Sequence, residues 1–101
     1  MSFWVYILHC SDGTYYTGHT DDLENRVAQH MSGDIAGYAS TRRPLRLVFA
    51  QEFPSRVEAL AAERQIKGWS RKKKEAMMRG DWQEVRRLAW GKRNPLPEFL
   101  R

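Results

Sequence analysis

The chain has 101 residues, which is enough for one small domain built around a single hydrophobic core. Its one cysteine, Cys10, excludes an internal disulfide and a cysteine metal cluster, and it favours a reducing, cytoplasmic setting. No apolar run approaches the roughly 20 residues that span a bilayer, so we expect no membrane partner.

The net charge of +5 is unevenly distributed along the chain. Residues 1–63 carry a net charge of −3, whereas residues 64–101 carry +8. A basic half is typical of proteins that bind nucleic acid, but surface helices are also commonly rich in lysine and arginine. Charge alone leaves both interpretations open.

Three strands are expected. Residues 3–9, "FWVYILH", are apolar on both faces, which predicts a central strand that is covered on both sides. The turn signal "SDG" leads into a second strand at residues 14–19. A third strand, residues 45–53, follows Pro44.

Four helices are expected, each preceded by a capping residue. Leu23, Val27 and Met31 form the predicted buried stripe of the first helix. The helices and their expected caps are 22–31 with Asp21 and Glu24, 56–69 with Ser55 and Glu58, 71–79 with Ser70, and 82–90 with Asp81 and Glu84, ending at Gly91. The order ββαβααα predicts an α+β fold with a three-stranded, antiparallel-containing sheet flanked by helices, as a single domain over residues 1–93 with an extended tail at 94–101.

The length of the first turn decides whether Tyr6 and Tyr16 share a face of the sheet. A two-residue turn would place them on opposite faces, because side chains alternate with a period of two. A three-residue loop, 11–13, reverses that parity and places Gly13 in the left-handed conformation. We prefer this loop because the glycine is third in "SDG". Tyr6 then faces Gly18, which leaves space beside the phenol ring.

Three further residues are candidates for a chemical role. Arg26 and His30 are four residues apart, so they share one helix face, although a pair of this kind is often only a surface pair. Glu63 projects beside apolar positions of its helix, so we expect it to be half-buried and to need a cation. Lys67, one turn later, is the simple partner, and a Mg²⁺ ion with a hydration shell is the alternative.

These residues resemble a known family. "VYIL" with "YYTGHT", then "NRVAQH", then "AAERQIKGW" are similar to the GIY-YIG nuclease domain in its small stand-alone form, over about residues 3–75. The first signature triplet keeps only its tyrosine, Tyr6, and the second, Tyr16-Thr17-Gly18, has threonine in place of isoleucine.

The resemblance implies a phosphodiesterase that uses one divalent ion, Mg²⁺ or Mn²⁺. It assigns Tyr6, Tyr16, Arg26 and His30 to catalysis and Glu63 to the metal, with His19 as a possible accessory residue. On this hypothesis Tyr6 is the general base, and Tyr16 forms a hydrogen bond with the scissile phosphate or with the attacking water. Arg26 neutralises transition-state charge, as positioned cations do in such reactions.

DNA, including single-stranded or structured DNA, is the expected partner. The expected phosphate-binding residues are Arg42, Arg43, Lys67, Arg71, Lys72, Lys73 and Lys74. Two other readings remain: a nucleic-acid-binding module of the same fold with little activity, and a partner-binding subunit that docks through Trp82, Val85, Leu88 and Ala89. A monomer is favoured.

Overall fold

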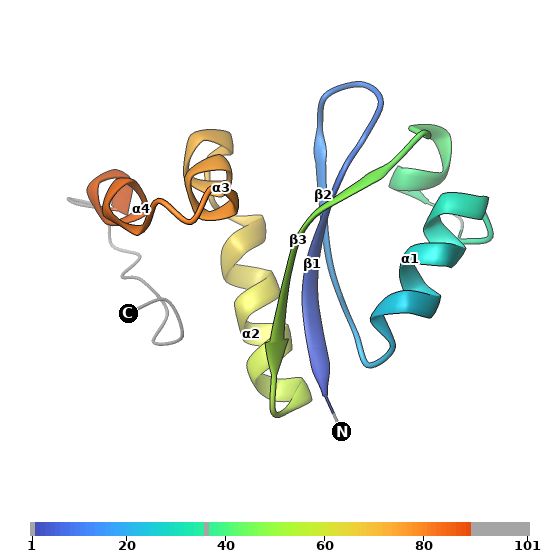
Figure 1. Ribbon diagram of the computed structural model, residues 1–101, viewed down its shortest axis with the longest axis horizontal. Helices are drawn as coiled ribbons and strands as arrows, with labels where there is room; N and C mark the ends of the chain where they lie inside the picture. Colours follow the sequence, from blue (N-terminus) through green and yellow to red (C-terminus); the bar gives the residue numbers. More distant parts are fainter. Residues whose placement is uncertain (1, 36, 90–101) are drawn as a thin grey trace. The chain divides into compact units, whose positions relative to one another are not determined.

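The computed structural model describes residues 2–35 and 37–89. Its elements follow the predicted order ββαβααα, with one added 3-10 turn, η1 (Figure 1). Their bounds are β1 Phe3–His9, β2 Tyr15–Thr20, α1 Leu23–Ser32, η1 Tyr38–Thr41, β3 Arg46–Phe53, α2 Arg56–Lys67, α3 Arg71–Met78 and α4 Trp82–Ala89. The α+β class and the three-stranded sheet are confirmed.

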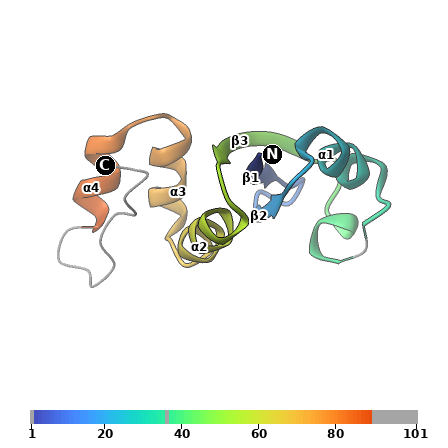
Figure 2. The same ribbon diagram turned by 90° about the horizontal axis from the view of Figure 1, so that it is seen from below.

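The sheet has the strand order β2-β1-β3, and both pairs of neighbours are antiparallel. The apolar strand β1 is central, as its sequence predicts, and Val5, Tyr6, Ile7 and Leu8 are all buried. Figure 2 shows α1 and the beginning of α2 on opposite sides of this sheet. Each face of β1 is therefore covered, which explains why its apolar residues run without alternation.

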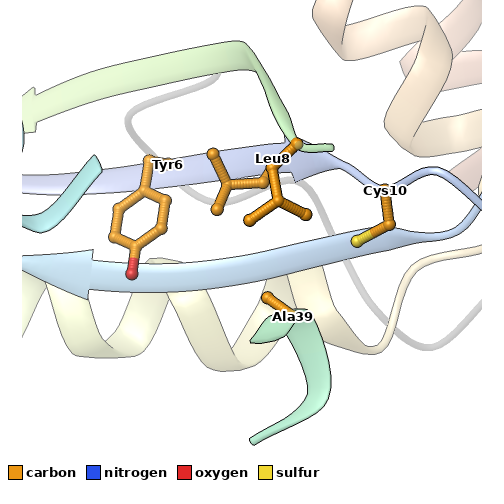
Figure 3. Close-up of a cluster of buried hydrophobic side chains, with 5 residues drawn as sticks. Tyr6, Leu8, Cys10 and Ala39 are labelled. Atoms are coloured by element: carbon orange, nitrogen blue, oxygen red, sulfur yellow. The ribbon is translucent and has the colours of Figure 1, made fainter. Parts of the chain in front are cut away.

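One face of β1 carries the core on the α1 side. Tyr6, Leu8 and Cys10 lie there with Ala39 of η1 (Figure 3) and with Leu45. Cys10 is a free, fully buried thiol. Tyr16 and Leu23 pack against this cluster. Tyr6 and Tyr16, which are both predicted site residues, therefore also belong to the hydrophobic core.

The predicted start of α1 is wrong by one residue. Asp22, not Asp21, is the N-cap, and its side chain accepts a hydrogen bond from the Asn25 backbone N–H at 3.3 Å. The Asp22 backbone N–H in turn donates to Thr20 Oγ1 at 3.0 Å, which holds Asp22 just outside the helix.

The buried stripe of α1 is also only partly as predicted. Leu23 packs against the core, but Met31 is 39% exposed. His30 is the buried residue of this helix, with 3% exposure. A polar residue that finds a partner inside the protein takes the place predicted for an apolar one.

The later caps are confirmed. Ser55 Oγ accepts from the Glu58 backbone N–H at 3.2 Å, and Ser70 Oγ accepts from that of Lys73 at 3.3 Å. Asp81 Oδ1 accepts from the Glu84 backbone N–H at 3.2 Å. These side chains satisfy N–H groups that the first turn of a helix leaves unpaired.

Contacts divide the chain into two compact units, Met1–Glu63 and Arg64–Arg101. In the second unit α3 packs against α4, and Val85 of α4 is fully buried. The single domain over residues 1–93 stays a prediction, and Gly91 and the tail at 94–101 lie outside the described residues. No helix in the described part of the chain is long and apolar enough to cross a bilayer.

Candidate functional site

The β1–β2 hairpin places Tyr6 and Tyr16 on the same face of the sheet. Tyr6 is opposite Gly18 and Tyr16 is opposite Leu8, which confirms the register expected from a three-residue loop. Gly13 has φ 85°, the left-handed conformation that this loop needs. The two phenol rings are 6.4 Å apart between centroids and tilted by 39°.

Gly18 lets the Tyr6 phenol lie directly on β2. A Cβ atom at residue 18 would be 2.6 Å from Tyr6 Oη, 2.7 Å from Tyr6 Cζ and 3.2 Å from Tyr16 Cε1. These distances are well below ordinary van der Waals contact. The missing side chain therefore sets the position of the Tyr6 hydroxyl.

His30 completes an aromatic group with the two tyrosines. Its Nε2 is 3.0 Å from Tyr6 Oη, and its ring centroid is 5.8 Å from that of Tyr6 and 5.2 Å from that of Tyr16. Burial, and then the charge of Arg26, lower the pKa of His30. His30 is therefore a neutral imidazole at neutral pH, and either it or Tyr6 donates the hydrogen bond, depending on its tautomer.

The hydroxyl of Tyr6 interacts electrostatically with three of the other predicted site residues. Burial raises the pKa of Tyr6, Tyr16 and Glu63 raise it further, and only Arg26 lowers it. Tyr6, which is 2% exposed, is thus a neutral phenol at neutral pH. Tyr16 shares the sheet face of Tyr6, whereas Glu63 acts on this hydroxyl from the other face, where it contacts His19.

Glu63 is more deeply buried than the sequence predicts. It is 7% exposed, and its Oε2 lies 3.0 Å from His19 Nδ1. His19 is opposite Val5, on the sheet face that Tyr6 does not share, so it turns toward α2. The sequence offered Lys67 as the partner of Glu63, and an ion pair between them stays a prediction.

The residues around Glu63 limit the kinds of divalent ion that could bind there. No group of three or more His, Cys, Asp or Glu side chains that could hold a metal occurs among residues 2–35 and 37–89. Structural zinc sites need four such ligands. One buried carboxylate instead suits Mg²⁺, which keeps several of its waters and takes further oxygens from a substrate phosphate.

The two expected phosphate-binding arginines of the first unit are held by local contacts. Arg42 Nε donates to Asp12 Oδ2 at 2.9 Å, and Arg43 Nε donates to the Ser40 carbonyl at 3.3 Å. Two hydrogen bonds from Thr14, and then the hydrogen bond and the charge of Arg42, lower the pKa of Asp12. These contacts hold both guanidinium groups in fixed positions.

The basic residues of the second unit differ from one another. Arg71 and Lys72 are exposed at the start of α3, and Arg71 Nε donates to Glu75 Oε2 at 3.2 Å. Lys73 is 5% exposed, its Nζ lies 4.1 Å from the Trp69 ring centroid, and burial lowers its pKa. Burial also lowers the pKa of Lys74, and Lys67 is exposed.

Sequence reasoning missed the pairing of His19 with Glu63. These residues are 44 positions apart, and His19 was only an accessory candidate. The signal that could have found the pair is the hairpin register, because it places His19 on the sheet face opposite to that of Tyr6.

Comparison with known proteins gives consistent results. A model of the GIY-YIG catalytic domain matches residues 2–76. The UPF0213 protein BH0048 of Halalkalibacterium halodurans is 46% identical over 78 residues, 77% of this chain and 83% of that protein. The UPF0213 protein VNG_2274C of Halobacterium salinarum is 49% identical over 73 residues, 72% of this chain and 95% of that protein.

Two solved structures also match. The solution NMR structure of BH0048, from Bacillus halodurans, has a TM-score of 0.53 and 41% identity, covering 88% of this chain and 98% of that one. The solution NMR structure of EF2693 from E. faecalis has a TM-score of 0.57 and 36% identity, covering 79% and 85%.

Proposed function

Because this chain belongs to the GIY-YIG catalytic domain family, which implies a nuclease-like activity, we propose that it is a metal-dependent endonuclease. Its substrate on this proposal is the phosphodiester bond of DNA, cut with low sequence specificity. The proposal rests on the environment of the Tyr6 hydroxyl. This hydroxyl is hydrogen-bonded to His30, packs on Gly18, and interacts electrostatically with Tyr16, Arg26 and Glu63.

The state of Tyr6 determines how it acts as a base. A phenol whose pKa is raised does not ionise at neutral pH, so Tyr6 does not act as a base through a phenolate that is formed before the reaction. The hydrogen bond to a neutral His30 offers a relay. Tyr6 Oη takes a proton from the attacking water as its own proton passes to His30 Nε2, while the water oxygen bonds to phosphorus. The bond between phosphorus and the 3′ oxygen breaks in the same step, and the departing 3′ oxygen takes a proton from solvent.

The remaining side chains act on the phosphate. Arg26 places a fixed positive charge near the Tyr6 hydroxyl, where it stabilises negative charge that develops on the phosphate oxygens. The Tyr16 hydroxyl binds the phosphate or the water. Glu63 would hold the divalent ion, which when bound supplies a Lewis acid for the leaving 3′ oxygen.

Exposed and partly exposed basic residues hold the DNA backbone on this proposal. Arg71, Lys72 and Lys74 of the second unit and Arg42 and Arg43 of the first can neutralise phosphates without reading bases. Lys67 joins this set, while Lys73 is held over Trp69 and contributes charge from a buried position. Contacts of this kind explain why low sequence specificity is expected.

The test is a cleavage assay on single-stranded, duplex and branched DNA with Mg²⁺ or Mn²⁺. We expect Tyr6→Phe, Tyr16→Phe and Glu63→Gln each to lower the rate at least tenfold, since each removes one of the assigned groups. Tyr15→Phe is the matched control, because Tyr15 packs edge-on against His9 and is no part of the assigned site. Wild-type cleavage by the Glu63→Gln variant would refute the metal role.

A protein that binds these DNAs but cuts none of them, with either ion, would refute the nuclease proposal. That result would favour the binding-module interpretation, in which the basic surface is used and the tyrosine group is only structural. Affinity measured on the same substrates, before any cleavage assay, separates the two functions.

A further inference from the structure

The contact between His19 and Glu63 joins two elements that are distant in the sequence. His19 projects from β2, and Glu63 projects from the second half of α2. The Nδ1–Oε2 distance is 3.0 Å, and the side chains are 26% and 10% exposed. The carboxylate is therefore nearly enclosed, while the imidazole keeps one side toward solvent.

We propose that His19 Nδ1 and Glu63 Oε2 together bind one divalent transition-metal ion, and that this pair binds Mn²⁺ in preference to Mg²⁺. This inference rests on the metal role proposed above for Glu63, and it adds a nitrogen ligand and a preference between ions. It makes His19 a direct ligand, not only a hydrogen-bond donor to the carboxylate.

The spacing of the two atoms agrees with shared coordination. Ligand bonds of about 2.1 Å at right angles, as in an octahedral site, separate neighbouring donor atoms by about 3.0 Å. That is the distance between the two atoms here. Binding needs only a change of tautomer in His19, in which its proton moves to Nε2 and Nδ1 becomes available to the ion.

The chemistry of the two donors determines the preference. Imidazole nitrogen is a good ligand for first-row transition metals, whereas Mg²⁺ prefers oxygen and gives up its waters reluctantly. His19 should therefore strengthen binding of Mn²⁺ and contribute little to binding of Mg²⁺. Two protein ligands also leave most coordination positions for water and phosphate oxygens, as a catalytic ion requires.

The full chain with His19→Gln separates coordination from positioning. Glutamine can still donate a hydrogen bond to Glu63 through its amide, but it provides no imidazole nitrogen. His9→Gln is the matched control, since His9 packs on Tyr15 in the same hairpin. Circular dichroism and thermal unfolding check that each variant folds.

Mn²⁺ binding is measured by electron paramagnetic resonance, and Mg²⁺ binding by its competition with Mn²⁺. We expect His19→Gln to weaken Mn²⁺ binding at least tenfold and to change Mg²⁺ binding less than twofold. Pulsed spectra of the Mn²⁺-loaded wild type and of His9→Gln should show coupling to one imidazole nitrogen, and those of His19→Gln should show none.

Two results would overturn the inference: no nitrogen coupling in the wild type, or an equal loss of Mn²⁺ and Mg²⁺ affinity in His19→Gln. The second would mean that His19 only orients Glu63. Nitrogen coupling in a protein that cleaves no DNA would support the metal pair and refute the nuclease proposal, so the two failures are distinguishable.

Discussion

Adding one methyl group at residue 18 should disable the candidate site. In Gly18→Ala the new Cβ would lie 2.6 Å from Tyr6 Oη, against the 3.4 Å at which ordinary contact begins. The phenol would therefore have to move by about 0.8 Å, and Tyr6 is 2% exposed, with little room to do so. Its 3.0 Å hydrogen bond to His30 would be broken or lengthened.

Overpacking of this kind costs about 1–3 kcal/mol in the free energy of unfolding. The alanine also restricts the unfolded chain, which returns about 0.4–1 kcal/mol because the φ of Gly18 is not positive. At the midpoints of these ranges the net destabilisation is about 1.3 kcal/mol, which lowers Tm by about 5–10 °C. A misplacement near 1 Å should lower the cleavage rate by about 100-fold.

The control for this substitution is Gly68→Ala. Gly68 lies just after α2, and its φ is not positive. A Cβ there would meet the Gln65 carbonyl oxygen at 3.5 Å and the Arg64 carbonyl oxygen at 4.0 Å, both at ordinary contact distance. Thermal unfolding and the DNA assay should leave this variant within about 0.5 kcal/mol of the wild type and fully active. If Gly18→Ala is as stable and as active as Gly68→Ala, the packing argument is wrong.

Two other predictions concern charge. The free energy of unfolding should fall as the pH is lowered from 7 through 5, because the pKa of His30 is lower in the folded protein than in the unfolded chain and protonation then favours unfolding. Urea unfolding should show that the free energy of unfolding depends less on pH in His30→Gln than in the control His9→Gln. An equal pH dependence in the two variants would refute the assignment to His30. In DNA binding, Lys72→Gln should reduce the slope of log Kobs against log salt concentration by about 0.9, which corresponds to the loss of one phosphate contact. The control Arg56→Gln, which breaks an exposed ion pair with Asp21, should leave that slope unchanged. Fluorescence anisotropy at several salt concentrations measures the slope for both variants.

Most of the sheet could be predicted because the relevant information is local. The apolar residues of β1 identify a central strand, and the glycine in "SDG" sets the loop length that puts Tyr6 and Tyr16 on one face. Ser55 and Ser70 mark helix starts for a similarly local reason, since each needs only a backbone N–H three residues later.

The errors arise where distant or competing contacts decide the structure. Asp21 and Asp22 are equally good caps in sequence, and the choice between them depends on a hydrogen bond from Asp22 to Thr20. The burial of His30 in place of Met31 depends on Tyr6, which is 24 positions away. Periodicity cannot anticipate a buried polar residue whose partner lies on another element.

The burial of His30 links the folding of this protein to its proposed activity. Its Nδ1 is buried and has no hydrogen-bond partner among the described residues, which is an unfavourable state for a polar atom in a core. Selection of variants for heat resistance alone should therefore replace His30 with an apolar residue. The selected variants should have a higher Tm and no DNA cleavage activity. The hydrophobic core and the proposed catalytic group share His30, so stability and the proposed activity make opposite demands on this residue.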